Sequence, residues 1–305
     1  QYAGELEQGD QESGLQMGYN FFAAVLFGVI YGDHLNEMRY RIRPYEVNPG
    51  ETDRVFEECA TILGDFLEND LTPPEKNITG FGRKWLNRSL AYKIRYLNYL
   101  FRNKKENQAL ERCRKLFAGI QVDYLKLKPV VKITGEFWAQ LTEGDGNYKM
   151  FDYLQEEGCE ILVEGVTAWV VYIIWHSELV FKALVAPESK SRRYGYWGKR
   201  TAKSKRWEGL RLSNLATFLL RKKFDQIGER LVGLNKKIPS FTYLAKLAEP
   251  YFDVRYEGGE GFLEIGKNIY YNKDRKAHMV LSLKPFGCMP STISDSVQSK
   301  VISDF

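Results

Sequence analysis

The sequence has little cysteine and little histidine, with 4 Cys and 3 His among 305 residues. The cysteines are unevenly spaced and include no CxxC pair; they are Cys59, Cys113, Cys159 and Cys288. So few thiols exclude a disulfide-rich secreted scaffold, because such domains depend on several closely spaced bridges. The histidines are dispersed and form no HExxH motif. We therefore expect a protein of a reducing compartment, the cytoplasm.

The sequence also lacks a long hydrophobic run. The most apolar stretch, residues 21–31, is about half of the ~20 residues that a membrane-spanning helix requires. It begins too far into the chain for a signal peptide and has no basic flank. We expect a buried helix there and no contact with a membrane. The composition, 44% hydrophobic and 27% charged, excludes general disorder.

The length of 305 residues predicts two domains or one large α/β unit. The chain begins with Gln1 rather than with methionine, and its last residues have a helical pattern. We therefore expect it to be a segment of a longer polypeptide.

The formal net charge of +5 is a local feature of the sequence. Residues 190–206 contain eight basic residues and no acidic one, so this segment alone carries more positive charge than the net charge of the whole chain. Aromatic residues lie among them, and this combination can bind phosphates and stack bases. Runs of like charge more often form solvated loops, so we favour a loop between helices. A nucleic-acid interface, or a docking surface for an acidic partner or an acyl-CoA phosphate, stays open.

Hydrophobic periodicity divides the chain into two parts. Residues 1–127 are mainly helical in pattern, with amphipathic stripes over 52–66 and 104–117. Residues 128–305 alternate between short β-rich runs and helical segments, with a basic insertion at about 187–207. The expected strands are residues 129–134, 159–163 and 278–283. Strands that alternate with helices at this spacing predict an α/β domain with a parallel sheet.

Ligands of open α/β sheets bind beyond the carboxyl ends of the strands. The segment 134–147 follows the first expected strand and is rich in glycine and polar side chains. We interpret it as a ligand pocket, because long loops in compact domains are often functional. A well hydrogen-bonded structural loop is the alternative. The candidate residues are Thr134, Gly135, Glu136, Gln140, Glu143, Asp145 and Asn147.

Cys288 lies on a turn bounded by glycine and proline, between the third expected strand and a final helix that we place from residue 294. The positive end of a helix dipole favours a thiolate, which binds metals or attacks electrophiles. No partner ligand lies at metal-site spacing, so the spacing alone does not favour a metal. The segment 261–268 matches GxxxxGK but lacks the following Ser or Thr, so we expect a helix there rather than a nucleotide-binding loop.

Several longer motifs resemble one known family, the 2-hydroxyacyl-CoA (2-hydroxyglutaryl-CoA) dehydratase superfamily, in its activase-associated branch. The motifs are residues 43–46 with 50–53, 128–140, 143–147, 258–261 with 266–270, and 283–291, the last of which contains Gly-Cys-Met-Pro. The similarity covers most of residues 17–305.

The resemblance implies a Rossmann-like parallel sheet with helices on both faces. It implies an iron–sulfur protein, with a 4Fe-4S or related cluster to which Cys288 contributes a ligand. The other ligands come from a further segment or subunit. An ATP-dependent activase of the benzoyl-CoA reductase activase type is the implied partner, and an acyl-CoA the implied substrate.

The family activity is that of a 2-hydroxyacyl-CoA dehydratase-like lyase or an ATP-dependent reductase component. The first alternative is a scaffold subunit that has kept the fold without the cluster. The second is a nucleic-acid-binding protein that uses the basic segment. The mildly acidic remainder of the chain argues against this second alternative.

Overall fold

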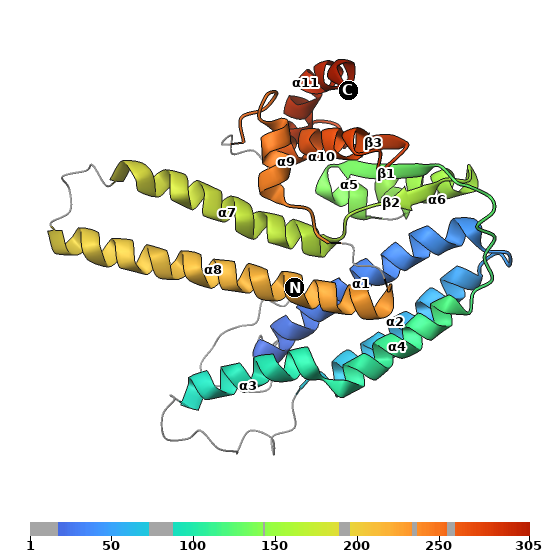
Figure 1. The fold of residues 1–305 in the computed structure, drawn as a ribbon, viewed down its shortest axis with the longest axis horizontal. Helices are drawn as coiled ribbons and strands as arrows, with labels where there is room; N and C mark the ends of the chain where they lie inside the picture. Colours follow the sequence, from blue (N-terminus) through green and yellow to red (C-terminus); the bar gives the residue numbers. More distant parts are fainter. Residues whose placement is uncertain (1–17, 73–87, 143, 189–195, 234–236, 255–259) are drawn as a thin grey trace.

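The computed structural model describes residues 18–72, 88–142, 144–188, 196–233, 237–254 and 260–305. The described chain is mostly helical, with a small three-stranded parallel sheet (Figure 1). The predicted combination of helices with a parallel sheet is confirmed. Among the described helices, none combines the length and the apolar composition that a membrane crossing requires.

The first helices follow the hydrophobic periodicity of the sequence. They are α1 Tyr19–Ile42, the 3-10 helix η1 Arg43–Tyr45, α2 Glu51–Asn69, α3 Arg88–Arg102 and α4 Lys104–Ala118. On α2, Val55, Cys59 and Leu63 recur every four residues, and all three are buried. Helix α4 begins after Asn103, whose side chain accepts a hydrogen bond from the amide of Lys105 (2.9 Å). Both predicted amphipathic helices are confirmed.

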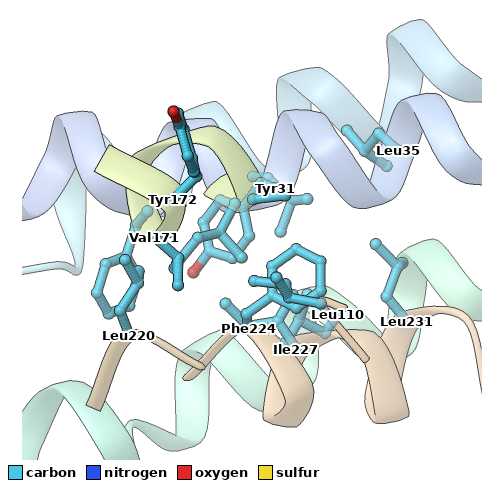
Figure 2. Close-up of a cluster of buried hydrophobic side chains, with 14 of the residues drawn as sticks. Tyr31, Leu35, Leu110, Val171, Tyr172, Leu220, Phe224, Ile227 and Leu231 are labelled. Atoms are coloured by element: carbon cyan, nitrogen blue, oxygen red, sulfur yellow. The ribbon is translucent and has the colours of Figure 1, made fainter. Parts of the chain in front are cut away.

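Two long helices from the second half of the chain complete the helical core. They are α7 Val166–Glu188 and α8 Tyr196–Leu231, which lie side by side and extend away from the sheet (Figure 1). Figure 2 shows Val171 of α7 and Ile227 of α8 packed in the same cluster as Tyr31 of α1 and Leu110 of α4. Helices from both halves of the chain therefore share one hydrophobic core. The predicted division after residue 127 stays a prediction.

The helical core contains a buried polar group that we call the helical-core network, made of Tyr31, Glu106 and Lys223. The ammonium group of Lys223 donates to Glu106 Oε2 (2.6 Å) and to the carbonyl oxygen of Leu100 (2.6 Å). The hydroxyl of Tyr31 donates to the other carboxylate oxygen, Glu106 Oε1 (2.8 Å). One cation thus meets one carboxylate, and both carboxylate oxygens accept hydrogen bonds. A buried ion pair is stable only when its charged atoms also have hydrogen-bond partners, and these three residues meet that condition.

The sheet consists of β1 Val130–Gly135, β2 Glu160–Leu162 and β3 Met279–Leu283. The strand order is β2-β1-β3, and the central strand β1 pairs in parallel with both neighbours. The three predicted strands are confirmed. The helices around the sheet are α5 Phe137–Leu141, the 3-10 helix η3 Gly144–Asn147, α6 Met150–Glu156, α9 Phe241–Ala248, α10 Gly261–Lys273 and α11 Met289–Asp304.

The two faces of the sheet differ in polarity, because side chains of β1 alternate between them. Val131 and Ile133 pack on one face with Phe151 of α6, in a small apolar cluster. Lys132 and Thr134 take the intervening positions, and both are buried. Lys132 meets Tyr271 of α10 on that second face, with its ammonium group 4.9 Å from the ring centre. The side facing α10 is therefore polar.

One carboxylate ties α1 to the start of α7, the helix that follows β2. Asp33 of α1 accepts hydrogen bonds from the amides of Val166 (2.8 Å) and Thr167 (2.7 Å), the first two residues of α7. These amides have no partner within the helix, so Asp33 acts as a cap supplied from a distant segment. A Cβ at Gly165 would overlap the Asp33 carboxyl group, which makes glycine the fitting residue there.

Two sequence-based boundaries are wrong. The loop expected over the basic segment does not extend over residues 196–207, because α8 already begins at Tyr196. Lysine, arginine and alanine are good helix formers, and their like charge does not stop a long helix. Residues 189–195 lie outside the described part. The final helix begins at Met289 rather than near residue 294, with Pro290 in its first turn, where proline is favoured.

Candidate functional site

The candidate site begins where β1 and β3 end side by side. The amide of Glu136, directly after β1, donates to the carbonyl oxygen of Leu283, the last residue of β3 (2.9 Å). Gly135 has a φ of +116°, and a Cβ there would overlap the backbone of Leu283. Only glycine fits this close approach without strain. The two segments predicted to carry function, 134–147 and the turn at Cys288, therefore leave the sheet next to each other.

Three candidate side chains of the first segment hold its own backbone. Glu136 accepts a hydrogen bond from the amide of Ala139 (2.9 Å) and so caps the short helix α5. Gln140 donates to the carbonyl oxygen of Gly135 (3.3 Å). Asn147 accepts from the amide of Met150 (3.3 Å), at the start of α6. The alternative of a well hydrogen-bonded structural segment thus accounts for part of this composition.

The candidate residues do not line one common cavity. Thr134 is buried and lines a cavity of about 450 Å³ beside β3, together with Ser282 and Lys284. Gln140 borders a different space, of about 20 Å³, at the ends of β1 and β2. Glu143 lies outside the described residues, and so does the side chain of Asp145. Their role in a ligand pocket stays a prediction.

Cys288 is the residue directly before α11, as the strand–turn–helix pattern predicts. Its carbonyl oxygen accepts hydrogen bonds from the amide (2.9 Å) and the hydroxyl (2.7 Å) of Thr292, and its thiol is free and half-buried. Large apolar side chains around it are exposed. They are Phe286 on the turn, and Met289 and Ile293, which are four residues apart and share a face of α11.

A complete metal site at Cys288 would need a set of further ligands. Within the described ranges, no group of three or more His, Cys, Asp or Glu side chains is placed to hold a metal ion. Cys159 directly precedes β2 and so lies at the amino end of the sheet, opposite to Cys288. An iron–sulfur cluster usually has four cysteine ligands. The described residues alone therefore do not fit a complete cluster, and Cys288 fits a single ligand position.

A second polar cluster, which the sequence did not reveal, lies at the carboxyl end of β2. We call it the sheet-end network; its members are Lys132 of β1, Glu164 after β2, and Lys267 and Tyr271 of α10. The carboxylate of Glu164 lies 2.5 Å from Lys267 Nζ and 3.5 Å from Lys132 Nζ. The hydroxyl of Tyr271 donates to it at 2.9 Å. One carboxylate thus joins two strands and a helix.

The surroundings of Glu164 fix its charge. Burial would raise the pKa of this carboxyl group, but the two lysine ammonium groups and the Tyr271 hydroxyl outweigh it and lower the pKa well below its ordinary range. Burial and the Glu164 charge raise the pKa of Tyr271 well above its ordinary value. Glu164 is therefore an ionised acceptor, a poor general base at neutral pH.

Glu260 supplies a second carboxylate next to this network. It accepts a hydrogen bond from the amide of Phe137 (3.0 Å), which ties the start of α5 to the start of α10. Burial raises the pKa of Glu260, although the charge of Lys267 opposes this. Two neighbouring carboxyl groups thus have pKa values displaced in opposite directions, and Glu260 is the one of the two that takes up a proton more readily.

Two spaces adjoin these carboxylates. The smaller one, of about 20 Å³, is bordered by Glu164, Glu260 and Lys267 and has room for about one water molecule. The larger is a cleft of about 640 Å³ between α1, β2 and α10. Glu164 and Tyr271 line this cleft from one side. Two members of the sheet-end network, Glu164 and Tyr271, therefore form part of the wall of a cavity large enough for a small molecule.

The sequence carried two weak signals of this network. Lys132 is a charged residue in the run Val-Val-Lys-Ile, which is unusual for a strand with neighbours on both sides. Lys267 belongs to the segment that imitates a phosphate-binding loop. The structure confirms the prediction of a helix there, and the lysine binds a carboxylate of the protein itself.

Comparisons of the chain with protein-family models, with curated proteins and with solved structures give no significant match. The class that the described residues define is a mainly helical α/β protein with a polar site at the carboxyl end of a parallel sheet.

Proposed function

We propose that this protein is the iron–sulfur electron-transfer component of a 2-hydroxyacyl-CoA dehydratase-type system, and that it acts in the cytoplasm with an ATP-dependent activase. The long motifs around residues 128–147 and 283–291 support the family. The acyl-CoA substrate and the activase partner are part of this proposal.

The strand order supports a Rossmann-like interpretation of the sheet. In doubly wound sheets of order 2-1-3, the chain reverses its direction of travel between the first and third strands. Ligands bind in the crevice outside this point. Here it lies between the ends of β1 and β3, where Glu136 meets Leu283 and where Cys288 follows. Helices cover both faces, with α6 on one side and α10 on the other.

The observation that carries the proposal is the setting of Cys288. A half-buried free thiol lies at the amino end of α11, where the helix dipole stabilises an anionic ligand. The fully exposed ring of Phe286 and the exposed side chain of Met289 flank it. Exposed apolar groups of this size are typical of a surface that another polypeptide covers.

Cys288 would supply one ligand to a cluster completed by another segment or subunit. When bound, the cluster supplies one-electron chemistry at low potential. The protein's own contribution is to orient the thiol through the rigid turn before α11 and to exclude water when the apolar side chains are covered. From the β1 side, the amide of Glu136 holds the end of β3 next to this turn.

The proposal is tested by anaerobic co-purification of this chain with its activase and its neighbouring cluster-bearing subunit or segment. Iron and acid-labile sulfide are measured per complex, together with the low-potential electron paramagnetic resonance signal. We expect iron and sulfide in the wild-type complex and their loss in Cys288→Ala. Cys159→Ala is the matched control, because that thiol lies at the opposite end of the sheet, and it keeps the cluster.

A complex that forms but contains neither iron nor sulfide contradicts the electron-transfer role. It would instead favour the second candidate, a scaffold subunit without a cluster. One observation supports that candidate: within the described ranges, no group of three or more potential metal ligands is placed to hold an ion, at Cys288 or elsewhere. The scaffold role predicts that Phe286→Ser weakens complex formation while Cys288→Ala leaves it unchanged.

A further inference from the structure

Two cysteines that are far apart in the sequence face each other in the helical core. Cys59 on α2 and Cys113 on α4 are both fully buried. The sulfur of Cys59 lies 3.8 Å from the carbonyl oxygen of Cys113, and the sulfur of Cys113 lies 3.8 Å from the carbonyl oxygen of Cys59. The reciprocal contacts mean that each thiol reaches the backbone of the other residue.

The two thiols also interact with each other. A hydrogen bond between the side chains, followed by burial, raises the pKa of Cys59, and the same hydrogen bond lowers the pKa of Cys113. Each sulfur lies beside the backbone of the other residue, so a disulfide between Cys59 and Cys113 requires the two side chains to turn toward each other. The other two cysteines, Cys159 and Cys288, lie at opposite ends of the sheet.

We propose that Cys59 and Cys113 are an oxidation site, at which an intramolecular disulfide links α2 to α4. The inference is independent of the proposed function, because it concerns neither Cys288 nor the sheet. It assigns a chemical role to two thiols that lie on the buried faces of α2 and α4.

The reaction needs an external disulfide, such as oxidised glutathione, as the oxidant. The Cys113 thiolate attacks one of its sulfurs, which gives a mixed disulfide and releases one glutathione thiolate. The Cys59 thiolate then attacks the Cys113 sulfur, forms the Cys59–Cys113 bond and releases the second glutathione. The protein thiols lose two protons and two electrons, and the oxidised glutathione accepts both and becomes two thiols.

Selectivity follows from proximity. Attack of the second thiol is intramolecular, and its effective concentration is highest for a cysteine that the fold places beside its partner. Because both residues are buried, oxidation requires either a transient opening of α2 from α4 or reaction during folding. We therefore expect slow oxidation of the native protein and rapid oxidation of a refolding chain.

The test has two arms, and both use the full chain. In the first, native protein is incubated with oxidised glutathione. In the second, reduced and unfolded protein is refolded in a glutathione redox buffer, so that burial does not prevent access. Remaining thiols are alkylated in denaturant, and the linked peptides are identified by mass spectrometry. We expect the number of free thiols to fall from 4 to 2, with Cys59 and Cys113 in one cross-linked peptide.

Matched variants separate this pair from the remaining thiols. Cys113→Ala and Cys59→Ala each abolish the intramolecular disulfide, and Cys159→Ala retains it. The proposal is overturned if neither arm links Cys59 to Cys113, or if the bond formed on refolding joins Cys159 or Cys288 instead. Circular dichroism of each refolded variant establishes that the comparison is made on folded protein.

Discussion

The two buried charge networks of this protein are built from the same residue types but differ in balance. In the helical-core network one lysine meets one glutamate, and the second hydrogen bond of Lys223 goes to a backbone carbonyl. In the sheet-end network one glutamate serves two lysines and lies at the wall of a cleft. A balanced, enclosed pair has a structural role. A shared carboxylate beside a cavity is the arrangement expected of a functional site.

The largest expected effect is that of Glu164→Gln. The substitution leaves two buried lysines without their carboxylate, which should lower the free energy of unfolding by about 4 kcal/mol. Urea unfolding followed by circular dichroism measures it. Glu111→Gln, at an exposed position on α4, is the control and should change stability by less than about 0.5 kcal/mol. A loss no larger than that of the control would contradict the role of Glu164 as the centre of its network.

Lys223→Met tests the helical-core network in the same assay. It leaves the carboxylate of Glu106 buried with only the Tyr31 hydroxyl as partner, and we expect a loss of about 3 kcal/mol. Combining it with Glu106→Gln removes the unpaired charge, so the double variant should regain a large part of this loss. The exposed neighbour Lys222→Met should be nearly neutral. Strictly additive losses in the double variant would show that the two groups do not form a pair.

Acidification should distinguish Glu164 from an ordinary carboxylate. The pKa of Glu164 is lowered in the folded state. Its contribution to stability is therefore present above the unfolded value of about 4.3 and is lost as the pH falls through the folded value. Below that unfolded value, the wild type should lose stability more steeply than Glu164→Gln, by up to about 1.4 kcal/mol per pH unit. Parallel pH profiles for the two proteins would rule out the lowered pKa.

The smallest expected effects come from the two tyrosine hydroxyls. Tyr31→Phe removes a hydrogen bond from Glu106, which has one lysine partner, and should cost about 2 kcal/mol. Tyr271→Phe removes one from Glu164, which keeps two lysines, and should cost about 1 kcal/mol. Thermal unfolding of both variants gives the comparison. A larger loss for Tyr271→Phe than for Tyr31→Phe would mean that the two lysines of Glu164 do not make up for the lost tyrosine hydrogen bond.

Local elements could be predicted from the sequence because their signals are local. The buried stripe of Val55, Cys59 and Leu63 recurs with the helical period and gave α2. Three short β-rich runs gave the strands of the sheet. Glycine and proline around Cys288 predicted its position between a strand and a helix. The first helical turn of α11, from Met289, was however predicted to be part of the preceding loop.

The polar contacts could not be predicted, because they join segments that only the tertiary structure brings together. Lys132, Glu164 and Lys267 stand on three separate elements, and no periodicity relates them. The same holds for the pairing of Cys59 with Cys113. Like charge in the basic segment was overrated as a signal for a loop, since the helix propensity of its residues supports α8.

The cap formed by Asp33 couples the position of α1 to the start of α7. The carboxylate holds the amides of Val166 and Thr167, and Glu164 stands only two residues before them. A partner that displaces α1 therefore breaks these two hydrogen bonds beside the wall of the cleft. The hydrogen-exchange rate of these two amides would report that displacement, because the rate rises when the Asp33 carboxylate no longer accepts their hydrogen bonds.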